Sequence, residues 1–322
     1  MNAGDAMEPR EECTGQSPAY RTRLTIEQLS RRASELRALM RECTLCPHEC
    51  RARRLDGRYG VCHSTAEAVI SSAAPHYGEE APLTGSCGSG TIFFTSCNLK
   101  CTFCQNYDIS QMRLGRRVSA QELGEIMLRL QQSGCHNINL VTPTHMVPQF
   151  VEALVHAAEA GLSIPVVYNC GGYESVRILK LLEDIVDIYM PDIKYSANEF
   201  ARRLSGAPGY WDIVRPAVKE MHRQVGDLMV DARGIARRGL LIRHLVLPNG
   251  LAGSRAVLDF ISRDVSPSTY VNIMDQYRPA YRALRYSELS RSIKESEYRE
   301  VLEYASAVGL HRGFHVNVAS AH

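Results

Sequence analysis

Apolar residues in the second part of the chain follow two alternating spacings. Helical spacing occurs at 119–134, where Ser119 is a predicted N-cap and Gly134 a predicted stop, and in the helix predicted to end at Gly161. Repeated strand and helix units predict an α/β fold with a parallel sheet, either open or curled into part of a barrel. Short apolar runs rich in β-branched residues predict the strands, at 91–95, 137–141, 165–168, 186–190, 240–247 and 270–274.

The first part of the chain has a different pattern. Residues 1–20 are polar without a period and predict a disordered tail, and Thr25 is the predicted N-cap of one amphipathic helix. Beyond this helix, residues 43–90 are rich in Cys, Arg, Gly and Pro and have little periodicity. We therefore predict a helix plus a cysteine-rich, metal-binding appendage at 21–85, followed by a partial barrel at 86–322.

Polar residues, glycine and proline follow most of the predicted strands. Because ligands gather at the carboxyl ends of parallel strands, we expect these segments to line one binding mouth. Thr142 and Asn169, each directly after a strand, are candidate cofactor contacts. The segments are "TPTH" (142–145), "NCGGY" (169–173), "PDIK" (191–194), "PNG" (248–250) and "DQYRP" (275–279).

Composition excludes several classes of protein. The chain has 37 basic and 35 acidic residues, a net charge of +2, and so lacks the basic surface of a duplex-binding protein. It contains no run of eighteen apolar residues, and its start has no basic segment followed by an apolar core. We expect a cytoplasmic protein with neither a nucleic-acid nor a membrane partner.

Cysteines are the most unusual feature of the composition. There are 11 of them, and eight lie between residues 43 and 104, seven of these in two tight groups. In a reducing cytoplasm, metal or cluster ligation explains such groups better than disulfides do.

The first cysteine candidate is the CxxxCxxC loop of Cys97, Cys101 and Cys104, directly after the first strand of the repeated series. Three thiolates on one short loop can hold three corners of a [4Fe-4S] cluster and leave one iron for a cofactor with amino and carboxylate groups. The alternative is a structural zinc site completed by Cys87 or a remote histidine. The loop's place at the ligand-binding end of the sheet favours the cluster.

A second set consists of Cys43, Cys46, Cys50 and Cys62, which together make four ligands and so a closed site. Zinc and an auxiliary iron–sulfur cluster use such ligands equally well, and both remain open. Neighbouring arginines could offset the thiolate charge, and His48 is expected to face solvent, although it could replace one thiolate. The arginines are Arg51, Arg53, Arg54 and Arg58.

The stretch "CNLKCTFCQN" resembles the cluster loop of the radical S-adenosylmethionine (SAM) superfamily. Together with "IRHLVLPNGLAG" and "VNIMDQYRP", it is similar to homologues of pyruvate formate-lyase activating enzyme that carry an extra N-terminal cysteine motif. The resemblance implies a partial (β/α)6 TIM-like barrel. It also implies reductive cleavage of S-adenosylmethionine at a [4Fe-4S] cluster, giving a 5'-deoxyadenosyl radical that abstracts hydrogen.

The same resemblance assigns roles to further residues. Phe103, Gln105 and Asn106 would lie along the adenosyl group. Asp192 and Lys194, in "MPDIK", would contact the ribose or the methionine carboxylate. Tyr277 takes the place of an adenosyl-contacting histidine and would stack on adenine. Where activating enzymes place a Gly-Gly-Glu for the methionine amine, this chain has Thr142 followed by Pro and Thr, so hydroxyls or carbonyls must serve.

Partners follow from the resemblance as well. An electron donor such as a flavodoxin or ferredoxin would reduce the cluster, and a glycyl radical enzyme would be the protein substrate. A small metabolite or another peptide is the alternative substrate. An electron-transfer or scaffold protein without catalytic activity is the alternative from another functional class.

Overall fold

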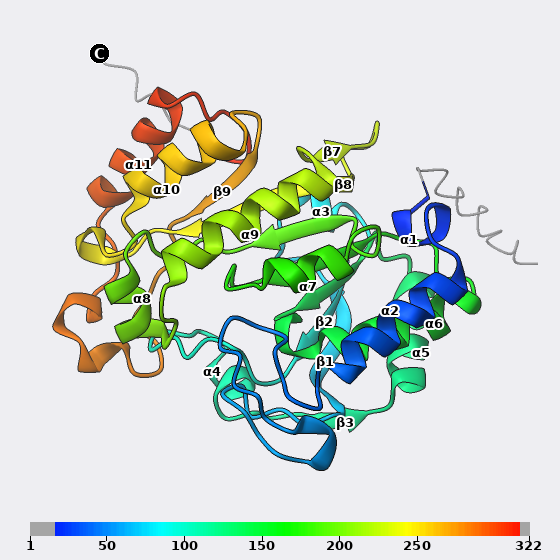
Figure 1. The fold of residues 1–322 in the computed structure, drawn as a ribbon. Helices are drawn as coiled ribbons and strands as arrows, with labels where there is room; N and C mark the ends of the chain where they lie inside the picture. The colour runs from blue at the N-terminus through cyan, green and yellow to red at the C-terminus, as the bar shows by residue number, and fades with distance from the viewer. Residues whose placement is uncertain (1–16, 316–322) are drawn as a thin grey trace, which may run out of the picture.

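The computed structural model describes residues 17–315 and shows a mixed sheet with helices packed on its outer face (Figure 1). The sheet has the strand order β3-β1-β2-β4-β5-β6-β8-β7, with β9 paired to β8. Its strands are β1 (Ala68–His76), β2 (Ser89–Phe94), β3 (Arg116–Val118), β4 (Ile138–Val141), β5 (Val166–Cys170), β6 (Ile188–Pro191), β7 (Met229–Val230), β8 (Ala236–Leu245) and β9 (Tyr270–Met274).

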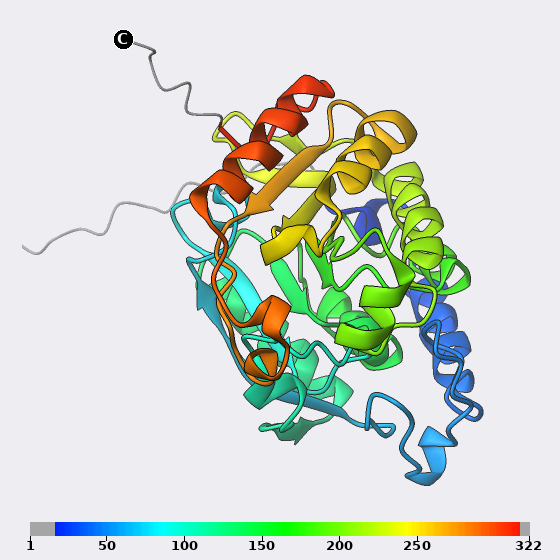
Figure 2. The ribbon, with the colours of Figure 1, turned by 90° about the vertical axis from the view of Figure 1, so that its left-hand side faces the viewer.

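The run β2, β4, β5, β6, β8, β9 is parallel throughout. These are the six strands that the apolar runs predict, displaced by a few residues at their ends. Among residues 17–315, no strand joins β9 back to the other edge, so the sheet does not close (Figure 2). The predicted α/β fold with a partial, parallel barrel is confirmed.

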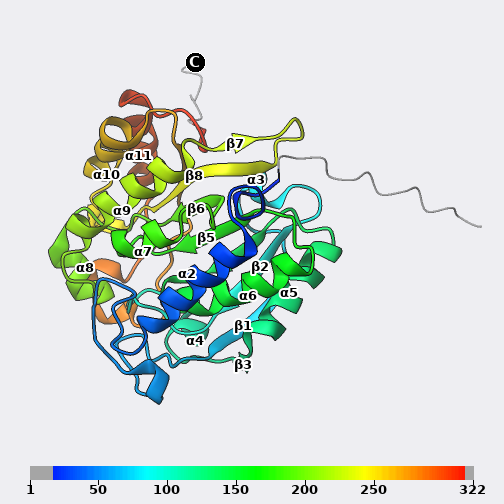
Figure 3. The same ribbon diagram turned by 45° about the vertical axis from the view of Figure 1, so that its right-hand side comes forward.

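Longer helices cover the sheet where the periodicity predicts them. The Thr25 side chain caps α2 by accepting from Gln28 N, and Ser119 caps α5 by accepting from Glu122 N. α2 packs on α6, and α6 packs on α5 (Figure 3). The main helices are α2 (Ile26–Ala38), α5 (Ala120–Gln132), α6 (Val147–Glu159), α7 (Val176–Leu181), α8 (Asn198–Ser205), α9 (Tyr210–Val225), α10 (Ser254–Phe260) and α11 (Glu295–Ala307).

Shorter helical segments complete the chain. α3 and α4 flank β2, and a five-residue π-helix follows α10. The segments are α1 (Ala19–Thr22), α3 (Ala81–Thr84), α4 (Tyr107–Ser110), η1 (Arg54–Asp56), η2 (Thr144–Met146), η3 (Pro248–Gly250), η4 (Ile261–Val265), η5 (Ala283–Arg285) and η6 (Ser287–Leu289). None of the helices within residues 17–315 is long and apolar enough to cross a membrane.

The predicted disordered tail, residues 1–20, includes residues at its C-terminal end that are folded. Residues 1–16 lie outside the described part of the chain, but Ala19 and Tyr20 are buried in α1. The Tyr20 hydroxyl donates to Ile164 O at 3.0 Å, and Ala19 N donates to a carboxylate oxygen of Asp187 at 2.7 Å. The folded chain therefore includes residues that the sequence assigned to the tail.

The predicted separate appendage at 21–85 is also wrong in extent. β1 pairs antiparallel with β2 and so belongs to the main sheet. Its sequence, "AVISSAAPH", alternates poorly and is half exposed, which explains why the apolar pattern did not reveal it. The cysteine-rich loops between α2 and β1 contain no strand and pack on the barrel through Arg54 and His48.

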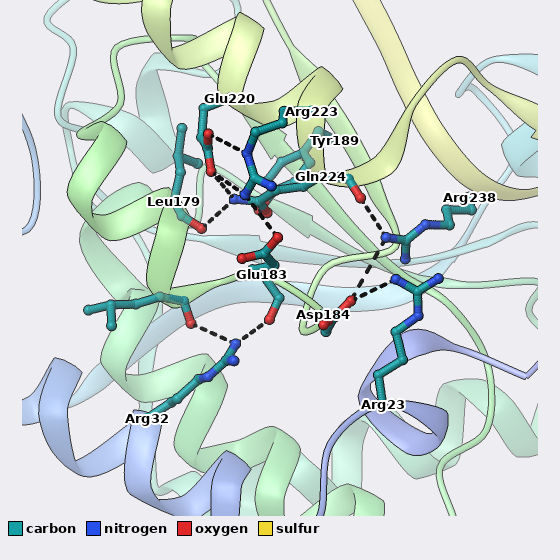
Figure 4. Close-up of polar contacts among 11 residues, drawn as sticks. Arg23, Arg32, Leu179, Glu183, Asp184, Tyr189, Glu220, Arg223, Gln224 and Arg238 are labelled. Carbon is teal, nitrogen blue, oxygen red and sulfur yellow. Dashed lines mark hydrogen bonds and ion pairs between the residues drawn. The ribbon is translucent and has the colours of Figure 1, made fainter.

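Polar contacts tie the N-terminal helices to the barrel (Figure 4). Arg23 forms an ion pair with Asp184 at 3.1 Å, and Arg32 donates to Glu183 O. Glu183 and Asp184 lie in the turn between α7 and β6. From the other side of this turn, Arg223 pairs with the Glu183 carboxylate at 2.8 Å. The turn between α7 and β6 is therefore held from both sides, which fixes the first helices against the sheet.

Candidate cluster and cofactor site

The three-cysteine loop leaves β2 at the carboxyl end of the parallel strands. Its backbone pairs with the C-terminal end of α8, because Lys100 N donates to Ser205 O at 2.7 Å and Thr102 N to Leu204 O at 2.8 Å. Gly206 ends α8 in the left-handed region, and a Cβ there would lie 3.3 Å from Lys100 Cβ. The close fit fixes the position of the loop.

Each of the three thiols has a hydrogen-bond partner. Leu99 N donates to Cys97 Sγ at 3.3 Å, and the Ser205 hydroxyl donates to Cys101 Sγ at 3.0 Å. Cys104 Sγ lies 3.1 Å from the Ser110 hydroxyl oxygen. Neither serine was predicted from the sequence. No local signal marks Ser205, which lies 104 residues from its partner, whereas Ser110 follows the motif closely enough to have been considered.

Burial strongly affects the thiols. It raises the pKa of Cys97 to about 12, and the nearby Cys101 and Cys104 contribute in the same direction. Burial also raises the pKa of Cys101, while the Lys194 ammonium opposes this rise. Such thiols become thiolates only when a strongly cationic group binds them.

The donor set fits a [4Fe-4S] cluster. Among residues 17–315, no three His, Cys, Asp or Glu side chains are close enough to bind a single metal ion. A cluster spaces its thiolates more widely, because each thiolate binds a different iron. Cys97, Cys101 and Cys104 lie on one short loop, close enough for their charges to interact, and such a loop can supply three of a cluster's ligands.

Asp192 and Lys194 lie beside this loop, directly after β6. Lys194 Nζ is 2.5 Å from Asp192 Oδ2, and both side chains are mostly buried. Although burial by itself lowers the pKa of Lys194, Asp192 and Cys101 raise it above the ordinary value, so the ammonium stays charged. The Tyr210 hydroxyl accepts from Lys194 N at 3.0 Å and holds this turn.

The two aromatic residues predicted to contact the cofactor, Phe103 and Tyr277, pack against each other at the cluster loop. The rings of Phe103 and Tyr277 are 5.8 Å apart, edge to face, and Tyr195 adds a third ring at 6.4 Å from Phe103. The Tyr277 hydroxyl donates to Leu289 O at 2.7 Å, and both predicted rings are buried. They form a packed apolar wall at the cluster loop.

The remaining predicted contacts share this edge of the sheet. Gln105 and Asn106 are exposed, and Gln105 Nε2 donates to Gln276 O at 3.0 Å, which joins the cluster loop to the end of β9. Thr142 N donates to Asn169 O at 2.8 Å, so the ends of β4 and β5 also meet. Thr142 has a φ of 60°, an uncommon backbone conformation for a threonine.

The N-terminal cysteines lie against the same loop. Cys43, Cys46 and Cys62 are buried and Cys50 is half buried. The expectation that His48 faces solvent is wrong: its Nε2 lies 2.8 Å from Asn98 O, and its ring packs on Tyr173 at 5.2 Å. The four cysteines do not form a compact single-ion site, and their metal stays a prediction.

Comparisons with known proteins agree with this geometry. The family model "Radical SAM superfamily" matches residues 91–234, which include the three-cysteine loop. The "Uncharacterized protein MJ0674" of Methanocaldococcus jannaschii is 34% identical over 282 residues, covering 84% of this chain and 76% of the relative.

Among solved structures, anSMEcpe with bound AdoMet is 13% identical with a TM-score of 0.44, covering 66% of this chain and 57% of that one. Streptococcus suis SuiB bound to S-adenosylmethionine is 14% identical with a TM-score of 0.45, covering 66% of this chain and 45% of that one. The chain thus spans about half the length of these structures. The family model decides the assignment: residues 91–234 of the chain form a radical SAM superfamily domain.

Proposed function

We propose that this protein reductively cleaves S-adenosylmethionine to start hydrogen abstraction from a substrate. The observation that carries the proposal is the convergence of three partnered thiols, Cys97, Cys101 and Cys104, with the charged Lys194 beside one of them. When bound, the cluster supplies one electron to the sulfonium, which yields methionine and a 5'-deoxyadenosyl radical.

The protein's own residues position and shield the reactants. Leu99 N, Ser205 and Ser110 orient the thiols. Lys194 offers a cation for the methionine carboxylate or a donor for the ribose, and Asp192 holds its charge in place. The wall of Phe103 and Tyr277 keeps water from one side of the site. Gln105, Asn106, Thr142 and Asn169 are proposed as contacts with the rest of the cofactor.

For the substrate, we propose the glycine of a partner glycyl radical enzyme, on the basis of the sequence resemblance to activating enzymes. A flavodoxin or ferredoxin would supply the electron in the cytoplasm. A small metabolite or another peptide is the alternative substrate. A glycyl radical signal, generated in a candidate partner by this protein together with S-adenosylmethionine, distinguishes the two. The N-terminal cysteines would hold a second metal centre.

The test of the activity is anaerobic reconstitution with iron and sulfide, followed by S-adenosylmethionine and titanium(III) citrate. We expect 5'-deoxyadenosine from the unaltered protein and none from Cys101→Ala. Cys135→Ala is the matched control, because Cys135 is equally buried but lies outside both cysteine sets. A protein that carries the cluster and yields no 5'-deoxyadenosine with any candidate substrate would favour the scaffold alternative.

A further inference from the structure

The turn after β6 carries Asp192 and Lys194, the two charged residues proposed to contact the cofactor, on either side of Ile193. Ile193 is fully buried, and consecutive residues of β8 hold both polar groups of its main chain. Ile193 N donates to Arg243 O at 2.8 Å, and Nδ1 of His244 lies 2.7 Å from Ile193 O. The ion pair places the side chains of Asp192 and Lys194 on the same side of Ile193. The orientation of Ile193 therefore determines where both charged side chains point.

His244 is a polar residue in an apolar row. Side chains alternate along β8, and the neighbours of His244 on its own face of the strand, Ile242 and Val246, are buried. His244 is itself fully buried, and its Nε2 lies 2.8 Å from the hydroxyl oxygen of Ser254, the first residue of α10. A buried imidazole costs free energy that an apolar side chain would not. The hydrogen bonds that it makes are therefore the reason to examine this position.

The partners of the ring fix its protonation. Because Ile193 O can only accept, Nδ1 of His244 must carry the proton and donate it. Nε2 of the neutral ring then accepts from the Ser254 hydroxyl. Burial lowers the pKa of His244 to about 4, so the ring is neutral near pH 7. Among residues 17–315, no other group donates to Ile193 O.

From this geometry we propose that His244 is a positioning residue for S-adenosylmethionine. Its Nδ1–H holds the Ile193 carbonyl, and Ile193 in turn keeps Asp192 and Lys194 in the orientation in which they contact the cofactor. His244 acts only through this turn, because its own side chain faces α10. The role in binding rests on the proposed function, whereas the effect of His244 on the pair of Asp192 and Lys194 does not.

Two substitutions separate the hydrogen bond from the bulk of the ring. In His244→Asn, the side-chain amide nitrogen can take the place of Nδ1 and keep the bond to Ile193 O. In His244→Gln, the amide takes the place of Nε2 beside Ser254, so Ile193 O loses its donor. If His244 served for packing alone, His244→Asn would be the more harmful change, because it leaves the larger cavity. The proposal predicts the opposite order.

The first measurement needs no cofactor. Acetic anhydride acetylates free amines, and an amine held in a buried ion pair reacts slowly because it stays protonated. In anaerobic, full-length protein, we expect the acetylation rate of Lys194, relative to that of the exposed Lys219, to rise at least fivefold in His244→Gln. The rise should stay below twofold in His244→Asn. An unchanged rate in His244→Gln, or an equal rise in both variants, overturns the proposal.

A measurement on the unaltered protein covers the case in which circular dichroism shows either variant to be unfolded. Nitrogen-15 magnetic resonance of labelled histidine rings reports which ring nitrogen carries the proton. We expect the proton of His244 on Nδ1, protected from exchange by the bond to Ile193 O. A proton on Nε2 instead would overturn the proposal, because Nδ1 could then not donate to this carbonyl.

The second measurement is the binding of S-adenosylmethionine to the reconstituted protein, by equilibrium dialysis. The dissociation constant should rise at least fivefold in His244→Gln and less than twofold in His244→Asn. With Asp192→Asn and Lys194→Met already present, His244→Gln should add less than twofold, because its effect passes through this pair. A fivefold increase that persists in this background overturns the proposal. If the unaltered protein does not bind S-adenosylmethionine, the proposed function fails, while the acetylation rates still decide whether His244 holds the pair.

Discussion

Lys194 holds its ammonium nitrogen 2.5 Å from a carboxylate oxygen of Asp192, and the charges of both residues act on the sulfur of Cys101. The pair lies directly after β6, at the edge where the cluster loop leaves β2. It therefore links the loop that would hold the cluster to the residues proposed to hold its cofactor.

The first prediction concerns the binding of S-adenosylmethionine. Lys194→Met removes the cation proposed for the methionine carboxylate or ribose, and we expect the dissociation constant to rise at least ~10-fold, about 1.4 kcal/mol. Equilibrium dialysis of the reconstituted protein measures it. Lys219→Met is the control, because Lys219 forms an exposed pair with Asp264. An unchanged dissociation constant would mean that Lys194 only balances Asp192.

The second prediction concerns the first cluster's reduction potential. Ser205→Ala removes the hydrogen bond to Cys101 Sγ, which stabilises the more negative, reduced state. One such bond is worth about 1 kcal/mol, so the midpoint potential should fall by about 40 mV. A redox titration followed by electron paramagnetic resonance measures it. Tyr195→Phe, which removes only the other partner of Ser205, should leave the potential nearly unchanged.

The third prediction compares two adjacent arginines. Arg54→Met leaves the buried carbonyls of Thr65 and His145 without their donor, and should cost about 3 kcal/mol of unfolding free energy. Arg53 is exposed and pairs with Asp56, so Arg53→Met should change the unfolding free energy by less than about 0.5 kcal/mol. Urea unfolding of anaerobic samples measures both. Similar values for the two variants would show that the buried hydrogen bonds of Arg54 do not stabilise the fold.

The fourth prediction concerns pH. Burial raises the pKa of Glu174 from 4.5 to about 7, although its hydroxyl partners Thr144 and Tyr168 oppose the rise. The folded state therefore binds the proton more tightly than the unfolded state does. The protonated carboxyl stabilises the fold fully below the unfolded pKa of 4.5. As pH rises from there through about 7, about 3 kcal/mol of unfolding free energy is lost.

Glu174→Gln should accordingly flatten the dependence of unfolding free energy on pH between about 4.5 and 7. Glu159→Gln, at an exposed position on α6, should retain the slope. Chemical unfolding at a series of pH values gives both curves. A slope that persists in Glu174→Gln would show that another group titrates in this range.

The fifth prediction concerns the space around Cys50. Gly60→Ala would place a methyl group 2.4 Å from the sulfur of Cys50 and should displace this ligand, with loss of most of the second centre's metal. Gly78→Ala is the control, since a Cβ there meets only the ring of the exposed His76. Metal analysis after gel filtration distinguishes them. Full metal content in Gly60→Ala would exclude Cys50 as a ligand.

Local patterns were enough to predict much of this protein. The six parallel strands and the capped helices at Thr25 and Ser119 follow from spacings within a few residues of one another, and the structure has them. The cluster loop could also be predicted, because Cys97, Cys101 and Cys104 lie close together in the sequence. In each case the chemistry depends on near neighbours in the sequence.

Tertiary structure alone decided the rest, since it depends on which distant segments pack together. β1 becomes a strand by pairing with β2, because its own residues alternate too weakly to predict one. Ser205 reaches Cys101 only because α8 ends against the cluster loop, and His48 leaves solvent only because its loop packs on Asn98. Arg54 looked like any other arginine in sequence. Its burial beside Cys43, with hydrogen bonds to the carbonyls of Thr65 and His145, depends on how the N-terminal loops pack on the barrel.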